Sequence, residues 1–413
     1  MSRRVLLVCY YFPPLGMGGI GRPLNLFQEL PHKGWECDIL TVKPVAYRGY
    51  EWELVETLDR ARIFRSGSLD PQRILYLLGV RKVKAATIER ARATSSRFFP
   101  DSKIGWVGPA IRRGRKLLKS NDYDVIMSSS PPVSCHMVAR QLSVQFDIPW
   151  VADFRDYWSV TKVEQTYQLP SLVERGNDLL DDIRRNAVRV TAVNQSIADY
   201  VGNGIVIRNA FHESFAQAWK EPPDNAKFRL GILGHGVDRE SWLWLVRLLA
   251  HVQQEDQKLV ERTELIQVGQ ADNDQMMNDL SQRGIKGQLK SHGHLSRSAT
   301  IEALNTTHAV YLGMSQPEGL QFVPGRVYDL LASGRPIISN ADPKSEIAKI
   351  ITESGNGWCF SHSEIDLASK KLSELAGGVF SGDSRITVRP EYARPYGSRR
   401  QAELFAELFG QII

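Results

Sequence analysis

The sequence predicts an α/β protein built from two doubly wound parallel sheets. In both halves, short apolar runs rich in Val and Ile alternate with longer helical patterns, which is typical of parallel strands joined by crossover helices. A chain of 413 residues is too long for one ordinary core and fits two domains. Near the middle, the turn-forming stretch Glu221–Asn225 interrupts both periodicities. We therefore expect one sheet on each side of it.

The expected strands follow from these apolar runs. In the first half they are Val5–Cys9, Asp38–Val42, Val125–Ser128, Trp150–Asp153, Val188–Val193 and Ile205–Ile207. In the second half they are Phe228–Leu233, Leu265–Val268, Ala309–Leu312, Ile337–Ser339 and Trp358–Phe360. The last residues carry Leu404, Phe405, Leu408 and Ile412 at helical spacing, which predicts an amphipathic helix. We expect domains at 1–208 and 228–396, a linker at 209–227 and a C-terminal helix at 397–413.

Composition indicates a folded cytoplasmic enzyme. Hydrophobic residues make up 42% and charged residues 24%, close to globular averages. The four cysteines lie far apart without a CxxC pair, so no zinc site or disulfide framework has local support. An apolar run follows Arg3 and Arg4, but Pro13 and Pro14 end it and no cleavage site follows, so we expect a buried strand there. No apolar stretch reaches the roughly 20 residues that cross a bilayer.

Charge is unevenly distributed along the chain. The net charge is +6, but Arg60–Lys119 holds 16 Lys and Arg against three acids, a local +13 that leaves −7 elsewhere. Such a segment predicts a face for an anionic membrane or phosphate, or else a merely solvated helix face. It includes Arg81, Lys82, Lys84, Arg90 and Arg92, and ends near Phe98 and Phe99. Nucleic acid is disfavoured because interleaved aromatics are missing.

A glycine-rich loop follows the first expected strand. Gly16, Gly18, Gly19 and Gly21 precede a helical pattern that starts near Pro23. Glycines before a helix let the backbone approach a ligand, and the helix N-terminus attracts an anion, so a phosphate or acceptor loop is expected. The same glycines fit GxGxxG, the pattern of an NAD-dependent oxidoreductase. Six residues separate strand and motif, however, and the second strand ends without an acid for a ribose. A turn that simply needs glycine is the third interpretation.

Four segments resemble the bacterial group 1 glycosyltransferases, also called glycosyltransferase family four, of the GT-B type. They cover most of the chain. They are the glycine loop with Leu30-Pro31 and Gly34–Glu36; Phe99–Trp106; Ser128–Pro132 with Ile148–Trp158; and Val323–Ile338.

The resemblance implies two Rossmann-like domains facing a cleft. The C-terminal domain then holds a nucleotide-sugar donor, a UDP- or GDP-sugar, and the N-terminal domain holds a saccharide or lipid-linked acceptor. The final helix crosses back to the N-terminal domain. The implied activity is retaining sugar transfer in cell-surface polysaccharide or glycan biosynthesis, without a cofactor. The basic segment at 60–119 adds the expectation of a cytoplasmic protein at the inner face of the cytoplasmic membrane. Fold alone does not define the substrate.

The fourth segment supplies the expected donor site. Gly325 permits close backbone approach, Arg326 can meet a diphosphate, and Asp329, which stands where the family commonly has glutamate, can accept ribose hydroxyl bonds. Alternatively, Asp329 only complements the helix dipole. Two features depart from the family. Gln321 replaces a frequent glutamate, and Leu233–Arg239 lacks the usual Arg and Lys, so either Arg239 compensates or Arg326 carries the diphosphate alone.

Transfer requires stabilisation of the leaving diphosphate, for which Gly18, Gly19, Gly325 and Arg326 are the candidates. After the Trp150–Asp153 strand, where many relatives have histidine, Asp153 can orient or deprotonate the acceptor and Arg155 can hold a phosphate. An internal Asp–Arg structural pair is equally compatible, and His136 is the weaker candidate.

Two DxD-like triplets, at 122–124 and 272–274, fit a turn and a helix cap, so no essential metal is expected. The departures from the family leave a second hypothesis, a GT-B scaffold that has lost transfer and serves as a binding or regulatory protein.

Overall fold

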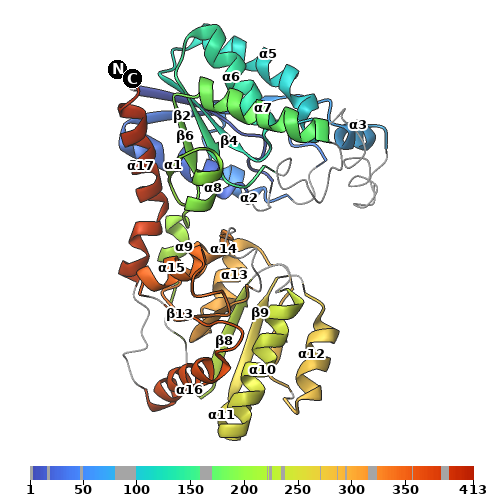
Figure 1. The fold of residues 1–413 in the computed structure, drawn as a ribbon, viewed down its shortest axis with the longest axis vertical. Coiled ribbons are helices and arrows are strands. Elements are labelled where there is room, and N and C mark those ends of the chain that lie inside the picture. Colours follow the sequence, from blue (N-terminus) through green and yellow to red (C-terminus); the bar gives the residue numbers. More distant parts are fainter. Residues whose placement is uncertain are drawn as a thin grey trace. The chain divides into compact units, whose positions relative to one another are not determined.

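The structure is a computed structural model that divides into two compact units (Figure 1). It describes residues 3–15, 19–46, 50–79, 99–158, 170–220, 222, 226–233, 238–269, 271–285, 287–293, 295–314, 323–355, 357–382 and 390–413. The first unit combines Met1–Ala210 with Ser398–Ile413, and the second is Phe211–Gly397. In the described part of the chain, no helix is both long and apolar enough to span a bilayer.

The first unit is built on a seven-stranded parallel sheet in the order β3-β2-β1-β4-β5-β6-β7. Its strands are β1 Arg3–Val8, β2 Trp35–Val42, β3 Ile63–Ser66, β4 Val125–Ser130, β5 Trp150–Phe154, β6 Arg189–Ala192 and β7 Ile205–Val206. Its helices are α1 Gly21–Glu29, α2 Glu53–Glu56, α3 Pro71–Leu77, α5 Ile104–Ser120, α6 Ser134–Phe146, α7 Pro170–Asn186, α8 Gln195–Tyr200 and α17 Ser398–Gly410, with 3-10 turns at Leu30–Lys33 and Arg60–Arg62.

Helices bury both faces of this sheet, as the apolar strands require. Along β1, Leu6 and Val8 join a core formed with α5, α6 and α7. Val5 and Leu7 point to the other face and join a core formed with α1 and α17. The rings of Phe409 on α17 and Trp35 on β2 lie 5.2 Å apart in an edge-on contact. The last helix therefore supplies part of the first unit's core.

The second unit holds a six-stranded parallel sheet in the order β10-β9-β8-β11-β12-β13. Its strands are β8 Phe228–Leu233, β9 Thr263–Val268, β10 Leu289–Ser291, β11 Ala309–Leu312, β12 Ile337–Ser339 and β13 Gly357–Cys359. Its helices are α9 Glu213–Gln217, α10 Arg239–Glu255, α11 Gln257–Glu261, α12 Asn273–Gln282, α13 Arg297–Leu304, α14 Arg326–Ala332, α15 Glu346–Glu353 and α16 Ile365–Ser381, with a 3-10 segment at Pro390–Tyr396. One core contains α10, α12 and α16, and the other contains α14 and α15.

These two sheets confirm the predicted α/β fold class, and each predicted strand overlaps an observed one. Two strands, β3 and β10, were not predicted. Both lie at sheet edges, and their residues are mostly half-buried, so they lack the apolar run that marks a central strand.

Part of the segment expected as a linker packs inside the second unit. Phe211 is 3% exposed and its N–H donates to the carbonyl of Tyr396 at 3.1 Å. The buried guanidinium of Arg335 donates to the carbonyls of Lys220 and Asn305, at 2.5 and 3.0 Å. The chain therefore enters the second unit directly after Ala210.

Each sheet has a topological switch point at the carboxyl ends of its central strands. In the first sheet it lies between β1 and β4, and in the second between β8 and β11, because successive connections leave these pairs in opposite directions. Ligands of open α/β sheets bind in such crevices. The candidate site residues are therefore expected at these two edges.

Candidate active site

Arg155 joins three loops at the carboxyl edge of the first sheet. It directly follows β5, and its Nε donates to the carbonyl of Ser130 at 3.0 Å, while Nη2 donates to that of Pro131 at 3.2 Å. Nη1 donates to the carbonyl of Gly19. Gly19 has φ +96°, which strongly favours glycine. The structure thus brings together two predicted residues, Gly19 and Arg155, whereas Gly18 lies outside the described residues.

Asp153 forms a buried ion pair with Arg22, at the start of α1. Nε and Nη2 of Arg22 donate to the two carboxylate oxygens at 3.0 and 2.6 Å. The hydroxyls of Ser129 and Thr191 donate to the same oxygens, each at 2.7 Å. Arg22 is 3% exposed and Asp153 is fully buried. Four donors therefore saturate this carboxylate.

This geometry favours the internal Asp–Arg pair over an acceptor base at Asp153. A base must reach the proton it removes, and a fully buried carboxylate with four donors offers neither access nor a vacant lone pair directed at an acceptor. The partner is Arg22, not the neighbouring Arg155. Arg22 was not predicted, although an arginine between Gly21 and Pro23 at the start of a helix was a signal available in the sequence.

The same guanidinium reaches the segment by which the chain leaves the first unit. Nη1 of Arg22 donates to the carbonyls of Ile207 and Arg208 at 2.8 and 3.0 Å. The Phe405 ring of α17 lies 4.8 Å from the guanidinium carbon. Gln401, also on α17, donates to the carbonyl of Arg208 at 2.7 Å. One arginine therefore connects α1, β5, the end of the sheet and the last helix.

His136 lies beneath this edge and has a structural role. Its Nδ1 is 2.7 Å from the hydroxyl of Ser128, which also accepts a bond from Trp150 Nε1 at 2.7 Å. Burial lowers the pKa of His136 to about 3, so the ring is neutral at physiological pH. Its Nε2 has no hydrogen-bond partner in the described part of the chain. Burial behind the strand end does not favour an acid–base role.

The second resembling segment, Phe99–Trp106, supports the same edge from outside the sheet. Both oxygens of Asp101 cap α6, accepting from the N–H and hydroxyl of Ser134 at 2.8 Å each. Burial raises the pKa of Asp101, while these bonds oppose the shift. Gly105 is required because a Cβ there would lie 2.6 Å from the backbone of Leu69. The segment therefore positions the loop between β4 and α6.

In the second unit, Arg326 lies where β11 ends. Its Nη2 donates to the carbonyl of Gly313 at 3.1 Å. Burial lowers the pKa of Arg326, and the nearby charge of Asp238 opposes this shift. Its Nε is buried without a hydrogen-bond partner among the described residues. Gly325, the N-cap of α14, is exposed, and a Cβ there would meet none of the described residues within 4 Å. Asp329 is half-buried in the first turn of α14.

Asn340 organises this edge and was not predicted. It directly follows β12 and is 1% exposed. Its Oδ1 accepts from the N–H of Met314 at 2.7 Å, and its Nδ2 donates to the hydroxyl of Ser241 at 3.1 Å. Asp238 caps α10 through the N–H of Ser241 at 2.9 Å. A polar residue directly after an apolar strand was the signal available in the sequence.

Arg239, one of the two expected diphosphate ligands, is engaged elsewhere. Its guanidinium forms a two-point ion pair with Asp279 on α12, one bond at 2.8 Å. Trp242 Nε1 donates to the same carboxylate at 2.8 Å. The charge of Arg239 is therefore already paired within the second unit. Residues 234–237 and Gln321 lie outside the described residues.

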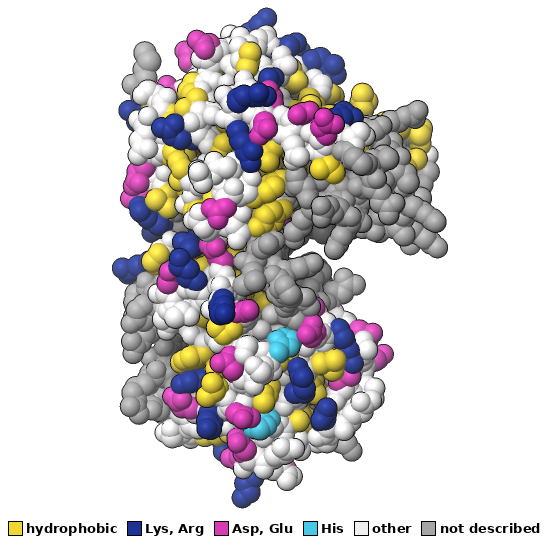
Figure 2. All heavy atoms as spheres, in the orientation of Figure 1, with side chains coloured by type: hydrophobic (Ala, Val, Ile, Leu, Met, Phe, Trp, Pro, Cys, Tyr) yellow, Lys and Arg dark blue, Asp and Glu magenta, His cyan; other side chains and the backbone are white. Residues whose placement is uncertain are grey.

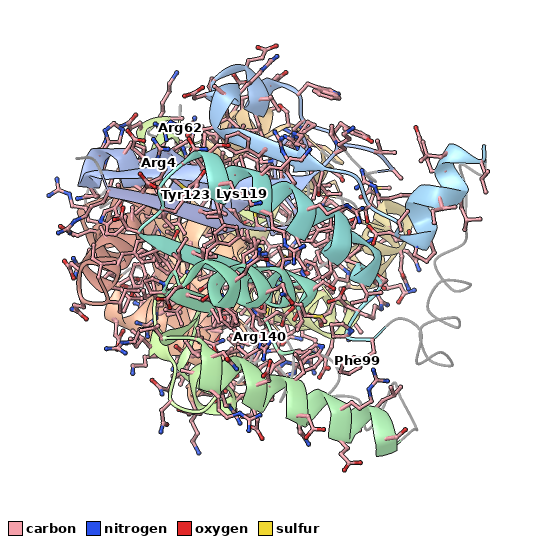
Figure 3. The ribbon with its side chains drawn as sticks, turned by 90° about the horizontal axis from the view of Figure 1, so that it is seen from above. Arg4, Arg62, Phe99, Lys119, Tyr123 and Arg140 are labelled. Carbon is pink, nitrogen blue, oxygen red and sulfur yellow. The ribbon has the colours of Figure 1, made fainter. Side chains whose placement is uncertain are left out.

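The basic segment Arg60–Lys119 is only partly available to a partner. Arg62 bonds to Glu36 at 2.8 Å and to Asp38 at 3.0 Å, and Arg4 and Tyr123 lie beside it (Figure 3). Arg73 is 4% exposed and donates to the carbonyl of Lys43. The cluster Arg81, Lys82, Lys84, Arg90 and Arg92 lies outside the described residues. A local charge of +13 therefore overstates the outward charge.

Asp272 of the second DxD-like triplet caps α12 by accepting from the N–H of Gln275 at 3.1 Å. Among the described residues, no three His, Cys, Asp or Glu side chains are grouped as metal ligands.

We expect the Arg22–Asp153 pair to behave as one energetic unit. Arg22→Met and Asp153→Asn should each lower the free energy of unfolding by about 3–5 kcal/mol, since each leaves a buried partner uncompensated. The double variant should lose clearly less than the sum, measured by urea denaturation. Arg4→Met is the control, because its ion pair with Glu36 is nearly 30% exposed on both sides. Additive single effects would contradict the coupling.

Burial of His136 predicts a pH dependence of stability. With a folded pKa of about 3 and an unfolded value near 6.5, the unfolded chain binds more protons between these pH values, so stability falls as pH falls through them. Between pH 7.5 and 5, wild type should lose about 2 kcal/mol more unfolding free energy than His136→Gln. Urea titrations at the two pH values measure the difference, and parallel losses would show that His136 is accessible to protons.

No protein-family model matches the chain, and no curated protein matches its sequence. Solved structures do match over its whole length. A sucrose-phosphate synthase from Thermosynechococcus elongatus has a TM-score of 0.63 at 12% identity, with 99% of both chains covered. HepE from Anabaena, solved with UDP-glucose, has a TM-score of 0.57 at 13% identity, with 99% of both chains covered.

WaaG, described as a glycosyltransferase involved in lipopolysaccharide biosynthesis, has a TM-score of 0.51 at 13% identity, covering 98% of this chain and 99% of that one. At such identities the likeness concerns the fold. The chain has the α/β architecture of GT-B glycosyltransferases, with two parallel sheets of seven and six strands.

Proposed function

We propose that the protein is a retaining glycosyltransferase that moves a sugar from a UDP- or GDP-sugar to a saccharide or lipid-linked acceptor. The observation that carries the proposal is the environment of Arg326. Its buried Nε lacks a hydrogen-bond partner among the described residues, at the carboxyl end of β11 and beside the switch point. Buried polar groups are rarely left without a partner, and a diphosphate oxygen would satisfy this one.

The donor site is assigned to the second unit. The open space at Gly325 lets a diphosphate approach the backbone, and Arg326 supplies the positive charge. Asp329, three residues further on, accepts the ribose hydroxyls. Asn340 holds the backbone at Met314, two residues after β11 ends. HepE was solved with UDP-glucose, which makes a uridine nucleotide the first to test.

The acceptor site is assigned to the first unit. In the part of the chain that the structure describes, Arg155 uses three of its five N–H groups to hold the carbonyls of Gly19, Ser130 and Pro131, which leaves two for an acceptor or phosphate. Asp153 acts as a positioning residue through Arg22. By the same proposal, the backbone N–H of Gly19 is a candidate to stabilise a phosphate, and Gly18, the other predicted residue, lies outside the described residues. Transfer breaks the bond between the anomeric carbon and the diphosphate oxygen, forms one to the acceptor oxygen and releases the acceptor's proton.

The charges that develop during transfer determine which stabilising groups the protein must supply. The sugar becomes cationic while the leaving diphosphate gains negative charge, and preorganised N–H groups and a guanidinium stabilise the latter. No covalent nucleophile is needed. Two rival hypotheses remain distinguishable by experiment. A binding scaffold would bind UDP without releasing sugar from UDP-glucose, and an NAD-dependent oxidoreductase would bind NAD instead.

We further propose that the protein works at the inner face of the cytoplasmic membrane, in polysaccharide or glycan assembly. Helix α5 contains no acid, and its exposed Arg112, Lys116 and Lys119 recur every three or four residues along one face. Lys and Arg side chains stand over α5 in Figure 2, and Figure 3 shows Lys119 on this helix. At the other end of α5, the exposed Leu77 and Leu78 of the α3 region offer apolar contact.

Arg326→Gln should weaken UDP binding roughly tenfold to a hundredfold, because it removes charge-assisted hydrogen bonds to the diphosphate. Isothermal calorimetry with UDP measures the change. The matched control is Arg239→Gln, which removes an arginine of the same unit whose charge is used by Asp279. Equal affinities for wild type and Arg326→Gln, or an equal loss in the control, would disprove the donor assignment.

The protein should co-sediment with anionic vesicles at low salt, and weakly with neutral ones. Each Lys or Arg near an anionic leaflet contributes about 1 kcal/mol, within a Debye length. The triple change Arg112→Gln, Lys116→Gln and Lys119→Gln should release most of the protein into the supernatant. The control triple change, Lys344→Gln, Lys349→Gln and Lys370→Gln, alters exposed lysines of the second unit. If both triple variants sediment alike, α5 is not the membrane face.

A further inference from the structure

Tyr50 and Trp52 form an exposed aromatic stack in the first unit. Their rings lie 5.7 Å apart and within 6° of parallel. Trp52 is 58% exposed and Tyr50 38%. The core does not need them, because Val55 and Leu58 are the buried residues of this short helical segment. Large aromatic side chains usually bury their area, so an ordered pair facing water indicates a binding surface.

The stack is fixed to the loop that carries the candidate acceptor residues. Tyr50 pairs with Leu15 in an antiparallel bridge, and the N–H of Glu51 donates to the carbonyl of Pro14 at 2.8 Å. From β3, Arg65 holds the same loop by donating to the carbonyl of Pro13. The loop continues to Gly19, which Arg155 holds. The pair therefore lies at the carboxyl edge of the first sheet, on the acceptor side.

The surrounding charges select the class of ligand. Glu51, Glu53 and Glu56 lie close to Tyr50 and Trp52 in the sequence, and carboxylates accept hydrogen bonds from hydroxyl groups while repelling anions. A pyranose ring offers a face of C–H groups that is attracted to the negative face of an aromatic ring, together with a rim of hydroxyls. Anionic lipid headgroups and nucleic acids would instead require basic side chains near the stack.

We propose that Tyr50 and Trp52 form a stacking platform for a neutral sugar ring of the acceptor. The proposal rests on the proposed function and makes it more specific. The acceptor is then a saccharide that has at least one sugar ring besides the part that carries the reacting hydroxyl. The platform holds the ring by its apolar face, and the glutamates bind its hydroxyls. Stacking tolerates different sugars, so the platform gives affinity and position, while the reacting hydroxyl is selected elsewhere.

Saturation-transfer NMR with cellobiose, maltose and lactose, in the presence of UDP, tests the platform on the full chain. Wild type should transfer saturation to sugar C–H protons, and Trp52→Ala should weaken binding by about tenfold, the upper range for one aromatic contact. Tyr50→Ala should weaken it as well, and Trp52→Phe should retain most of it. Trp358→Ala is the matched control, a tryptophan of the second unit that is 37% exposed.

Three outcomes would overturn the platform: no transfer to any of the three disaccharides, equal transfer in wild type and Trp52→Ala, or an equal loss in Trp358→Ala. Loss of vesicle co-sedimentation in Trp52→Ala with saccharide binding unchanged would also overturn it and assign the pair to the bilayer. Calorimetry with UDP separates this proposal from the proposed function. If the protein binds UDP but no disaccharide, only the platform is contradicted. If the protein does not bind UDP, the donor assignment is contradicted.

Discussion

The buried ion pair between Arg22 and Asp153 is the interaction on which the first unit's candidate site depends. An unpaired charge of either sign would be very costly in that interior. The ion pair and its hydrogen bonds to the hydroxyl partners therefore form together or not at all. The guanidinium of Arg22, at the start of α1, contacts three other parts of the first unit. These are the end of β5, the carbonyl of Arg208 where the chain leaves the unit, and the ring of Phe405. The glycine loop ends one residue before Arg22, so its position follows from the same constraint. Mechanistically, Asp153 contributes by orientation rather than by proton transfer.

Arginine side chains that hold backbone carbonyls recur at both sheet edges. Arg65 and Arg155 hold opposite ends of the loop after β1, and Arg326 holds the backbone after β11. A planar guanidinium satisfies several carbonyls in a defined geometry, which orders loops that lack secondary structure of their own. It also leaves positive potential at the edge where an anion would bind. The same arginines therefore order the loops and attract a ligand. A substitution separates these two effects only when a matched arginine elsewhere in the chain is changed in parallel.

The sequence was sufficient for the fold and insufficient for the pairing within the site. Central strands appear in the sequence as apolar runs because both of their faces are buried. This is why β1, β4 and β8 were predicted and the edge strands β3 and β10 were not. Asp153 was recognised as an acid at the end of a strand, but its partner lies 131 residues earlier, and no periodicity links such positions. Asn340 carried no pattern beyond its place after a strand. The glycine loop was recognised from its glycines ahead of a helix, and Arg326 from a resemblance, and their ligands remain a proposal.

Helix α17 makes the first unit discontinuous in sequence. The apolar side of this helix, with Phe405 and Phe409, fills a core whose other walls come from β1, β2 and α1. The second unit is a single stretch, Phe211–Gly397, that contains all of its own strands. A chain growing from its N-terminus therefore completes the second unit's sequence before the first unit's core can close. Until α17 has been synthesised, one face of the first sheet lacks this cover, and chaperone binding or aggregation at the exposed face would compete with folding.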